Sequence, residues 1–246
     1  MIRFFTSPSL VSGGQIQLSA EDAAHIRSLR LRPSELFIVC DGEGTDYICK
    51  LGDKAKPEQG PAAEIVESRP SVGEPSVSCQ VYIALMKGDR LDYAVQKSVE
   101  LGASGVVLYP SERCIAAPRD MSSKTVRLRR IALETAKQCG RGRVPDVSLA
   151  ASFKEAVERA ARADLRLFFY ESENDLHLKQ ALSGENLETG ISVSLVTGPE
   201  GGFEPHEAAY VSSAGFTTVS LGPRILRCET APVVALAAVM YHTGNL

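Results

Sequence analysis

The fold is decided by two segments near the C-terminus: Thr197-Gly198-Pro199-Glu200-Gly201-Gly202-Phe203 and Leu221-Gly222-Pro223-Arg224-Ile225-Leu226-Arg227-Cys228-Glu229-Thr230. Each segment follows a short run rich in β-branched residues, at 191–196 and at 217–221, which is typical of a buried parallel strand. Each segment also leads into a helix-like stretch. This order of strand, glycine-rich turn and helix, twice in succession, predicts an α/β fold.

The two turns are expected to form a ligand-binding crevice. In α/β sheets, ligands bind at the carboxyl ends of neighbouring strands. Glycine has no side chain, so backbone N–H and C=O groups in these turns can approach a ligand closely. The alternative is that both segments are ordinary turns between strands and helices.

The chain divides into two predicted domains. Residues 1–72 are mainly β-structure with one helix capped by Ser19, and the linker at 69–75 is rich in Pro, Gly and Ser. Residues 73–246 alternate between strands and helices, which predicts a mostly parallel sheet covered by helices on both faces. The expected strands lie at 36–40, 47–51, 63–66, 81–86, 106–108 and 165–169, and the expected helices at 90–101, 124–139 and 229–242.

Charge is unevenly distributed along the chain. The net charge of the 246 residues is −3, which argues against a wholly basic nucleic-acid-binding protein. Residues 112–143, however, contain nine Lys and Arg residues against three acidic ones. A basic block in an acidic protein fits a docking face for phosphate, and the alternative is a solvated helix face.

Metal, hydrolase and membrane functions have little support. The six cysteines are scattered without a Cys-x-x-Cys pair, and the four histidines have no metal-ligand spacing. The first residues lack the apolar core of a signal peptide, and no apolar stretch is long enough to cross a bilayer. We therefore expect a cytoplasmic protein with reduced thiols and without a metal.

These residues closely resemble the RsmE-type 16S ribosomal RNA (uracil-N3)-methyltransferases, which belong to the SPOUT class of knotted methyltransferases. The resemblance covers essentially the whole chain in order. Besides the two C-terminal segments, it includes the blocks 25–30, 87–90, 96–102, 111–114 and 134–141. Two departures are small: Glu204 stands where Ser is common, and Cys228 stands where a small polar residue is usual.

The resemblance implies a specific function. The family uses S-adenosylmethionine to methylate N3 of one uridine near the decoding region of the small ribosomal subunit. It has a PUA-like β-barrel followed by a domain that is tied in a trefoil knot and forms a homodimer. Two alternatives stay open: another SPOUT activity such as ribose 2′-O methylation, and a non-catalytic ribosome-assembly factor that binds RNA.

Candidate cofactor-binding residues follow from both segments and from the end of a preceding strand. Ile225 and Leu226 are expected to sandwich the adenine, and Phe169 with Tyr170 to form a third wall. For Glu200 two roles stay open, binding a ligand amine or satisfying loop N–H groups, and the loop role is favoured. The full predicted set is Phe169, Tyr170, Thr197, Gly198, Pro199, Glu200, Gly201, Gly202, Leu221, Gly222, Ile225 and Leu226.

Candidate catalytic residues are Arg224, Arg227 and Glu229. Uracil N3 carries a proton, so methylation requires a base or cations that stabilise the anionic ring. Arginine stays protonated, so Arg224 and Arg227 would stabilise or orient, whereas Glu229 is the candidate base. The alternative for Glu229 is a structural acid at a helix N-terminus. The expected RNA-binding residues are Arg3, Arg27, Arg30, Arg32, Arg113, Arg141 and Arg143.

Overall fold

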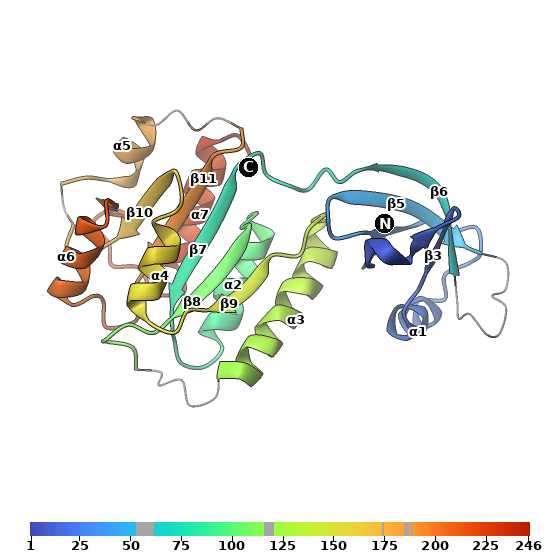
Figure 1. Ribbon diagram of the computed structural model, residues 1–246, viewed down its shortest axis with the longest axis horizontal. Helices are drawn as coiled ribbons and strands as arrows, with labels where there is room; N and C mark the ends of the chain where they lie inside the picture. Colours follow the sequence, from blue (N-terminus) through green and yellow to red (C-terminus); the bar gives the residue numbers. More distant parts are fainter. Residues whose placement is uncertain (53–61, 116–120, 174, 185–186, 188) are drawn as a thin grey trace. The chain divides into compact units, whose positions relative to one another are not determined.

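The computed structural model describes residues 1–52, 62–115, 121–173, 175–184, 187 and 189–246 (Figure 1). These residues form two compact units. The N-terminal unit comprises Met1–Glu74 and Ala136–Val144, and the C-terminal unit comprises Pro75–Thr135 and Pro145–Leu246. The return of residues 136–144 to the N-terminal unit is a long-range contact that no local pattern predicts.

In its described residues the N-terminal unit has a six-stranded sheet and the helix α1 (Ala20–Ser28), and it also takes in the last residues of α3 (Met121–Cys139). The strands follow the spatial order β1-β4-β5-β6-β3-β2, and only the β1–β4 pair is parallel. Its elements are β1 (Arg3–Phe5), a 3-10 turn (Pro8–Leu10), β2 (Val11–Ser12), β3 (Gln15–Gln17), α1 (Ala20–Ser28), β4 (Phe37–Cys40), β5 (Thr45–Leu51) and β6 (Ala62–Pro70). The turn at 41–44 joins β4 and β5, which pair antiparallel. This unit is the small β domain that the sequence predicts, and it fits the PUA-like domain that the resemblance implies.

A buried apolar core holds this unit together. Phe4, Ile16, Phe37 and Val39 are fully buried within it. The predicted cap of α1 is confirmed, because the Ser19 hydroxyl accepts a hydrogen bond from the Asp22 backbone N–H at 3.0 Å.

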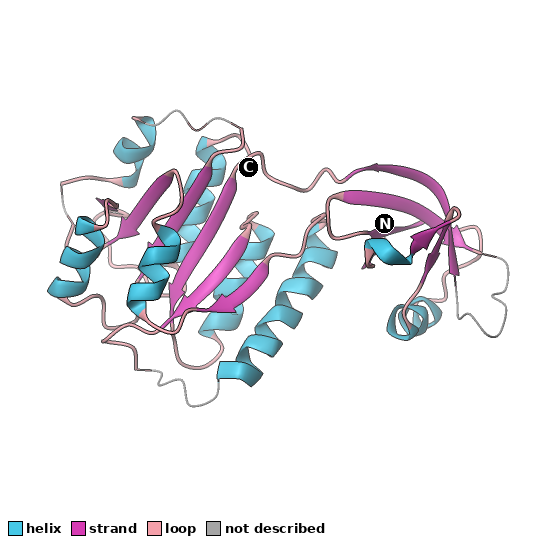
Figure 2. Cartoon of the chain, in the orientation of Figure 1, coloured by secondary structure: helices cyan, strands magenta, loops and turns pink. Residues whose placement is uncertain are grey.

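The C-terminal unit has a six-stranded sheet in which every pair is parallel (Figure 2). The strand order is β12-β10-β11-β7-β8-β9. The strands are β7 (Ser78–Ala84), β8 (Gly105–Tyr109), β9 (Asp146–Leu149), β10 (Leu165–Phe169), β11 (Ser192–Thr197) and β12 (Thr217–Val219). This confirms the predicted parallel sheet, to which the structure adds β9 as a strand that the sequence did not predict.

Helices cover both faces of this sheet, as Figure 2 shows. The helices α2 (Arg90–Glu100) and α7 (Ala231–His242) pack against each other and on one face, and α4 (Phe153–Ala160) and α6 (Pro205–Ser213) cover the other. Two further helices are α3 (Met121–Cys139) and α5 (Leu178–Ser183). The helix predicted at 229–242 begins two residues later, because residues 228–230 form a turn. Asp89 directly precedes α2, and its side chain makes no capping hydrogen bond.

The order of the strands positions the site. The chain runs from β7 outward to β9 and then crosses to β10, with β11 inserted between β10 and β7. Phe169, at the end of β10, pairs with Thr197 at the end of β11 and with Val219 at the end of β12. Three carboxyl ends therefore meet at one edge of the sheet, which is where a parallel α/β sheet binds its ligands.

Candidate functional site

A cavity of about 480 Å³ lies at these carboxyl ends. It is formed by Arg90, the first residue of α2, by residues at the end of β10 and just after it, and by both glycine segments. The described residues that line it are Arg90, Phe169, Tyr170, Glu171, Gly198, Pro199, Glu200, Gly201, Gly202, Val219, Ser220, Leu221, Gly222, Arg224, Ile225, Leu226, Arg227, Cys228, Glu229 and Ala231. We call this the strand-end cavity.

Most residues predicted from the sequence meet in this cavity. All three candidate catalytic residues line it, and so do all predicted cofactor residues except Thr197. Thr197 is fully buried in β11, where its hydroxyl donates to the Tyr82 carbonyl and its own carbonyl accepts from the Tyr109 hydroxyl. Thr197 therefore anchors the strand and does not reach the cavity.

The glycines at 198, 201 and 202 are required by close packing. A Cβ on Gly198 would lie 2.8 Å from the Phe203 ring, and one on Gly201 would lie 2.9 Å from the Arg113 Cβ. Gly202 has φ of +70°, and a Cβ there would lie 1.9 Å from the Glu171 Oε1. That oxygen accepts a hydrogen bond from the Phe203 backbone N–H at 3.0 Å. The loop after β11 is thus held in one shape by its neighbours.

Glu200 links two segments that are far apart in the sequence. Its Oε1 accepts hydrogen bonds from the Lys87 backbone N–H at 3.2 Å and from the Arg90 guanidinium at 3.0 Å. The first contact agrees with the favoured loop role of Glu200. Its Oε2 is buried and has no hydrogen-bond partner within the described residues.

Cys228 and Glu229 form a hydrogen-bonded pair in the wall of the cavity. The Cys228 thiol donates to the Glu229 Oε2 at 3.2 Å. Burial and this hydrogen bond raise the pKa of the Cys228 thiol to about 12, so it stays protonated and is no nucleophile at neutral pH. Burial alone would raise the pKa of Glu229. Hydrogen bonds from its own backbone N–H and from Cys228, with the nearby cations Arg90 and Arg227, lower the pKa below its ordinary value, so the carboxyl is ionised.

Sequence reasoning missed five of the lining residues: Arg90, Glu171, Val219, Ser220 and Ala231. Glu171 directly follows the predicted pair Phe169 and Tyr170, and Ser220 directly precedes the second glycine segment, so extending each predicted set by one residue would have found them. Ser220 accepts a hydrogen bond from the Gly222 backbone N–H at 3.2 Å and thereby holds the second turn. Arg90 belongs to the block 87–90 that resembles the family, but it lies 110 residues before Glu200, so only the fold brings it to this cavity.

The expected RNA-binding arginines fall into two groups. Arg27, Arg30, Arg32, Arg113 and Arg143 are exposed. Arg113 also donates to the Glu204 carboxylate at 2.6 Å, which lowers the pKa of Glu204, and to the Gly201 carbonyl. Of the basic block at 112–143, Arg119 lies outside the described residues.

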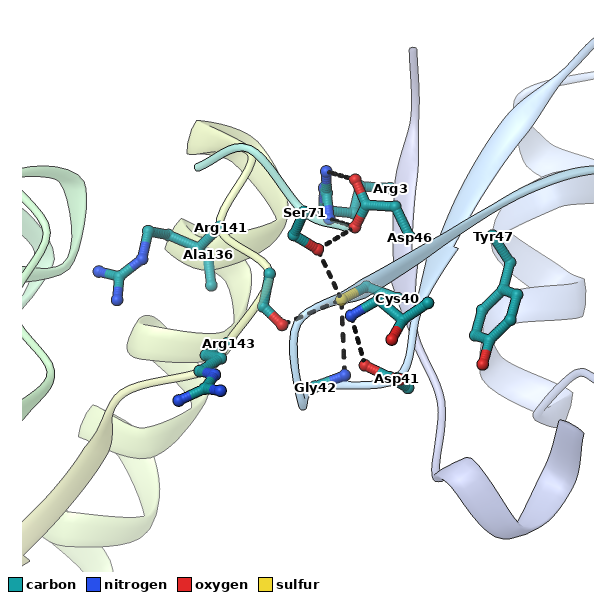
Figure 3. Close-up of polar contacts among 12 residues, drawn as sticks. Arg3, Cys40, Asp41, Gly42, Asp46, Tyr47, Ser71, Ala136, Arg141 and Arg143 are labelled. Atoms are coloured by element: carbon teal, nitrogen blue, oxygen red, sulfur yellow. Dashed lines mark hydrogen bonds and ion pairs between the residues drawn. The ribbon is translucent and has the colours of Figure 1, made fainter. Parts of the chain in front are cut away.

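The structure argues against the RNA-binding role expected of Arg3 and Arg141. Arg3 is 8% exposed and makes two hydrogen bonds to Asp46, in a polar network that continues through Ser71 and Cys40 (Figure 3). Arg141 is 4% exposed and pairs with Glu74, whose carboxylate also accepts the backbone N–H groups of residues 142 and 143. Both guanidinium groups are neutralised inside the N-terminal unit, so neither is placed to contact RNA.

We expect Glu74→Ala to destabilise the N-terminal unit by about 3 kcal/mol, because removing one partner of a buried ion pair leaves the other charge uncompensated. The free energy of unfolding in urea measures this loss. Glu64→Ala is the matched control, since it removes only the exposed pair with Lys50 and is expected to cost less than about 1 kcal/mol. A loss of that small size in Glu74→Ala would contradict a stabilising role of the Arg141–Glu74 pair.

Comparisons with known proteins assign the family. A family model described as an RNA methyltransferase domain matches residues 73–240. The ribosomal RNA small subunit methyltransferase E of Bacillus subtilis is 30% identical over 254 residues, which cover all of this chain and 98% of that protein. The chain belongs to this family. The Synechocystis member is 32% identical, with 96% of this chain and 76% of that protein covered.

Solved structures of this family share the fold. The ribosomal RNA small subunit methyltransferase E from Neisseria gonorrhoeae, bound to S-adenosyl methionine, superposes with a TM-score of 0.84 at 30% identity, covering 98% of this chain and 97% of its own. A Legionella pneumophila methyltransferase in complex with the same cofactor gives a TM-score of 0.82 at 26% identity, with the same coverage. Within the described residues, no helix is long and apolar enough to cross a membrane, and no group of His, Cys, Asp and Glu has the arrangement of a metal site.

Proposed function

We propose that this family member transfers a methyl group from S-adenosylmethionine to N3 of a uridine in 16S ribosomal RNA, with the small ribosomal subunit as the substrate. The observation that carries the proposal is the strand-end cavity, in which both glycine segments meet three arginines and three glutamates. The relatives named above, and the cofactor bound in two of their structures, support the same activity.

The cavity fits S-adenosylmethionine. The cofactor carries an adenine ring, a cationic sulfonium and an ammonium group. Apolar side chains of Leu221 and Leu226 can contact the ring, while the carboxylates of Glu171, Glu200 and Glu229 can balance the positive charges. The close-packed glycines leave backbone groups open to the ligand. Ile225 also lines the cavity, but 81% of it is exposed in the structure of the chain alone.

Residues of the cavity can provide the base and the cations that methylation of uracil N3 requires. When bound, the cofactor provides an electrophilic methyl group on sulfur. Glu229 is ionised and can therefore accept the N3 proton, although its lowered pKa makes it a weak base. Arg224 and Arg227 are exposed cations in the cavity wall and can orient the incoming nucleotide and stabilise charge on it.

RNA contacts are proposed for the exposed arginines only. Arg27, Arg30 and Arg32 lie in or just after α1 of the N-terminal unit, and Arg113 lies beside the loop after β11. Arg143 is exposed, and its guanidinium donates to the Glu43 carbonyl at 3.2 Å. Such side chains contact phosphates and position the RNA, whereas the target base is selected in the cavity.

We also propose a homodimer that forms through the C-terminal domain. Helix α7 buries one face in its own unit, but Val234, Ala238 and Tyr241 follow one another at helical spacing on the opposite side. Val234 is 38% exposed and Tyr241 is 77% exposed, and α2, which packs beside α7, adds Tyr93 at 46%. The trefoil knot and the cytoplasmic location that the sequence implies stay predictions.

Tyr241→Glu is expected to convert the dimer to monomers, because a charge in a buried apolar interface loses its hydration. Sedimentation velocity measures the change in mass. Val72→Glu serves as the control, since Val72 is 86% exposed and lies in the N-terminal unit. A wild-type chain that sediments as a monomer would contradict the proposed dimer.

Calorimetric titration with S-adenosylmethionine tests the proposed function at its first step. We expect saturable binding with one site per chain or one per dimer. Absence of binding would overturn the enzymatic proposal and favour an RNA-binding assembly factor, because such a factor has no need of the strand-end cavity.

A further inference from the structure

Arg90 is distinguished from the other two arginines of the strand-end cavity by how it is held. Its guanidinium donates to the Glu200 Oε1 at 3.0 Å, and the Glu200 side chain is only 14% exposed. No side-chain hydrogen bond or ion pair fixes Arg224 or Arg227 within the described residues, and both are exposed. A long side chain that is already fixed loses little further freedom when a ligand binds. Arg90 is thus the pre-organised cation of the cavity.

The anchor of Arg90 is itself part of the cofactor loop. Glu200 belongs to the first glycine segment, and the same oxygen that binds Arg90 accepts the Lys87 backbone N–H. The contact therefore ties the connection between β7 and α2 to the loop after β11. Because Arg90 is 43% exposed and makes no other hydrogen bond within the described residues, it keeps N–H donors that can point into the cavity.

Arg90 is also placed where a cation could stabilise the negative charge that develops on the uracil ring during the reaction. Arg90 lines the same cavity as the candidate base Glu229, and the charges of Arg90 and Arg227 help to lower the pKa of that carboxyl. When the N3–H bond of uracil breaks and the proton passes to the base, the electron pair is shared between N3, O2 and O4. Fixed N–H donors directed at those oxygens stabilise this anion until N3 bonds to the methyl carbon. The carbon–sulfur bond of the cofactor would break in the same step, with its electron pair passing to sulfur and leaving a neutral thioether.

We propose that Arg90 is a catalytic residue that stabilises the uracil anion through O2 or O4, and that Glu200 is the positioning residue that aims it. This inference rests on the proposed function. It gives the three arginines different tasks: Arg90 stabilises the anion, while Arg224 and Arg227 orient the nucleotide. It also gives Glu200 a role in catalysis besides the loop role predicted for it.

The test compares Arg90→Ala, Arg90→Lys and Glu200→Gln with the wild type on two substrates, small subunits containing 16S RNA made with uridine or with 5-fluorouridine. Fluorine withdraws electrons and makes N3–H more acidic, so a fluorinated base needs less stabilisation of its anion. Lys97→Ala is the control, since Lys97 is a cation on the same helix that pairs with Glu100 outside the cavity.

We expect Arg90→Ala to lower kcat on the uridine substrate about 100-fold relative to the wild type. On the fluorinated substrate the same variant should lose much less of the wild-type kcat. Arg90→Lys and Glu200→Gln should show smaller losses with the same recovery, and Lys97→Ala should show none. Binding of S-adenosylmethionine, measured by calorimetry, should stay within a few-fold in Arg90→Ala and show that the variant is folded.

Equal losses on both substrates, or a loss confined to the affinity for RNA or cofactor, would overturn the role of Arg90. An unchanged kcat in Arg90→Ala would overturn it as well. If instead the wild-type chain methylates neither substrate, the proposed function fails, and that result is separate from any result on Arg90.

Discussion

Replacing Gly202 by alanine is expected to weaken the binding of S-adenosylmethionine at least about 100-fold. Gly202 has φ of +70°, a conformation that costs an L-residue about 1–2 kcal/mol. The new Cβ would also lie 1.9 Å from the Glu171 Oε1 and displace it. The Phe203 backbone N–H would lose its acceptor, at a cost of about 1–3 kcal/mol. Together these costs favour a relaxed loop that no longer forms the cavity wall.

Calorimetric titration measures this affinity, and Gly244→Ala provides the matched control. Gly244 has nearly the same φ, +71°, but a Cβ there meets no atom within 4 Å. It lies after α7 and does not line the cavity. We expect this control to lose some stability and to bind the cofactor as the wild type does. If Gly202→Ala also binds normally, the first glycine segment does not shape the cofactor site.

Arg227→Ala is expected to reduce kcat/KM for the RNA substrate about 100-fold while cofactor affinity changes by no more than a few-fold. Arg227 is exposed in the cavity wall, so its removal leaves no buried partner unpaired. An orienting residue acts on the geometry of attack, and a displacement of about 1 Å can cost about 100-fold in rate. Single-turnover methylation assays, together with the same titration, separate the two effects.

The control for Arg227 is Arg162→Ala, since Arg162 is an exposed arginine that does not line the cavity. We expect its kcat/KM to be unchanged. A collapse of cofactor binding in Arg227→Ala would place Arg227 in the cofactor site. Unchanged turnover would remove it from the reaction.

The sequence predicts the location of the site well for a topological reason. In a parallel sheet all carboxyl ends lie at one edge, so turns that follow Phe169, Thr197 and Val219 meet wherever their strands are neighbours. Local pattern alone could place the strands, the turns and the helices that follow. It could not place Arg90, because its partner Glu200 is far away in the sequence and only the pairing of β7 with β11 brings the two together.

Charge patterns predict exposure poorly. Arg3 and Arg141 are as basic as Arg27 and Arg143 in the sequence, yet Asp46 and Glu74 neutralise them inside the N-terminal unit. The partners are separated by 43 and 67 residues, so no spacing rule connects them. Residues 136–144 join the N-terminal unit for the same reason, through hydrogen bonds to Glu74 and Cys40 that only the folded chain reveals.

The most direct test of the central claim is nucleoside analysis of the reaction product. Small subunits that lack the modification are incubated with the purified protein and S-adenosylmethionine, and the digested 16S RNA is analysed by mass spectrometry. We predict one new 3-methyluridine per subunit and none without the cofactor. A 2′-O-methylated nucleoside in place of 3-methyluridine would contradict methylation of uracil N3. The absence of any methylated nucleoside would contradict it too, provided that the protein binds the cofactor and the subunits are intact.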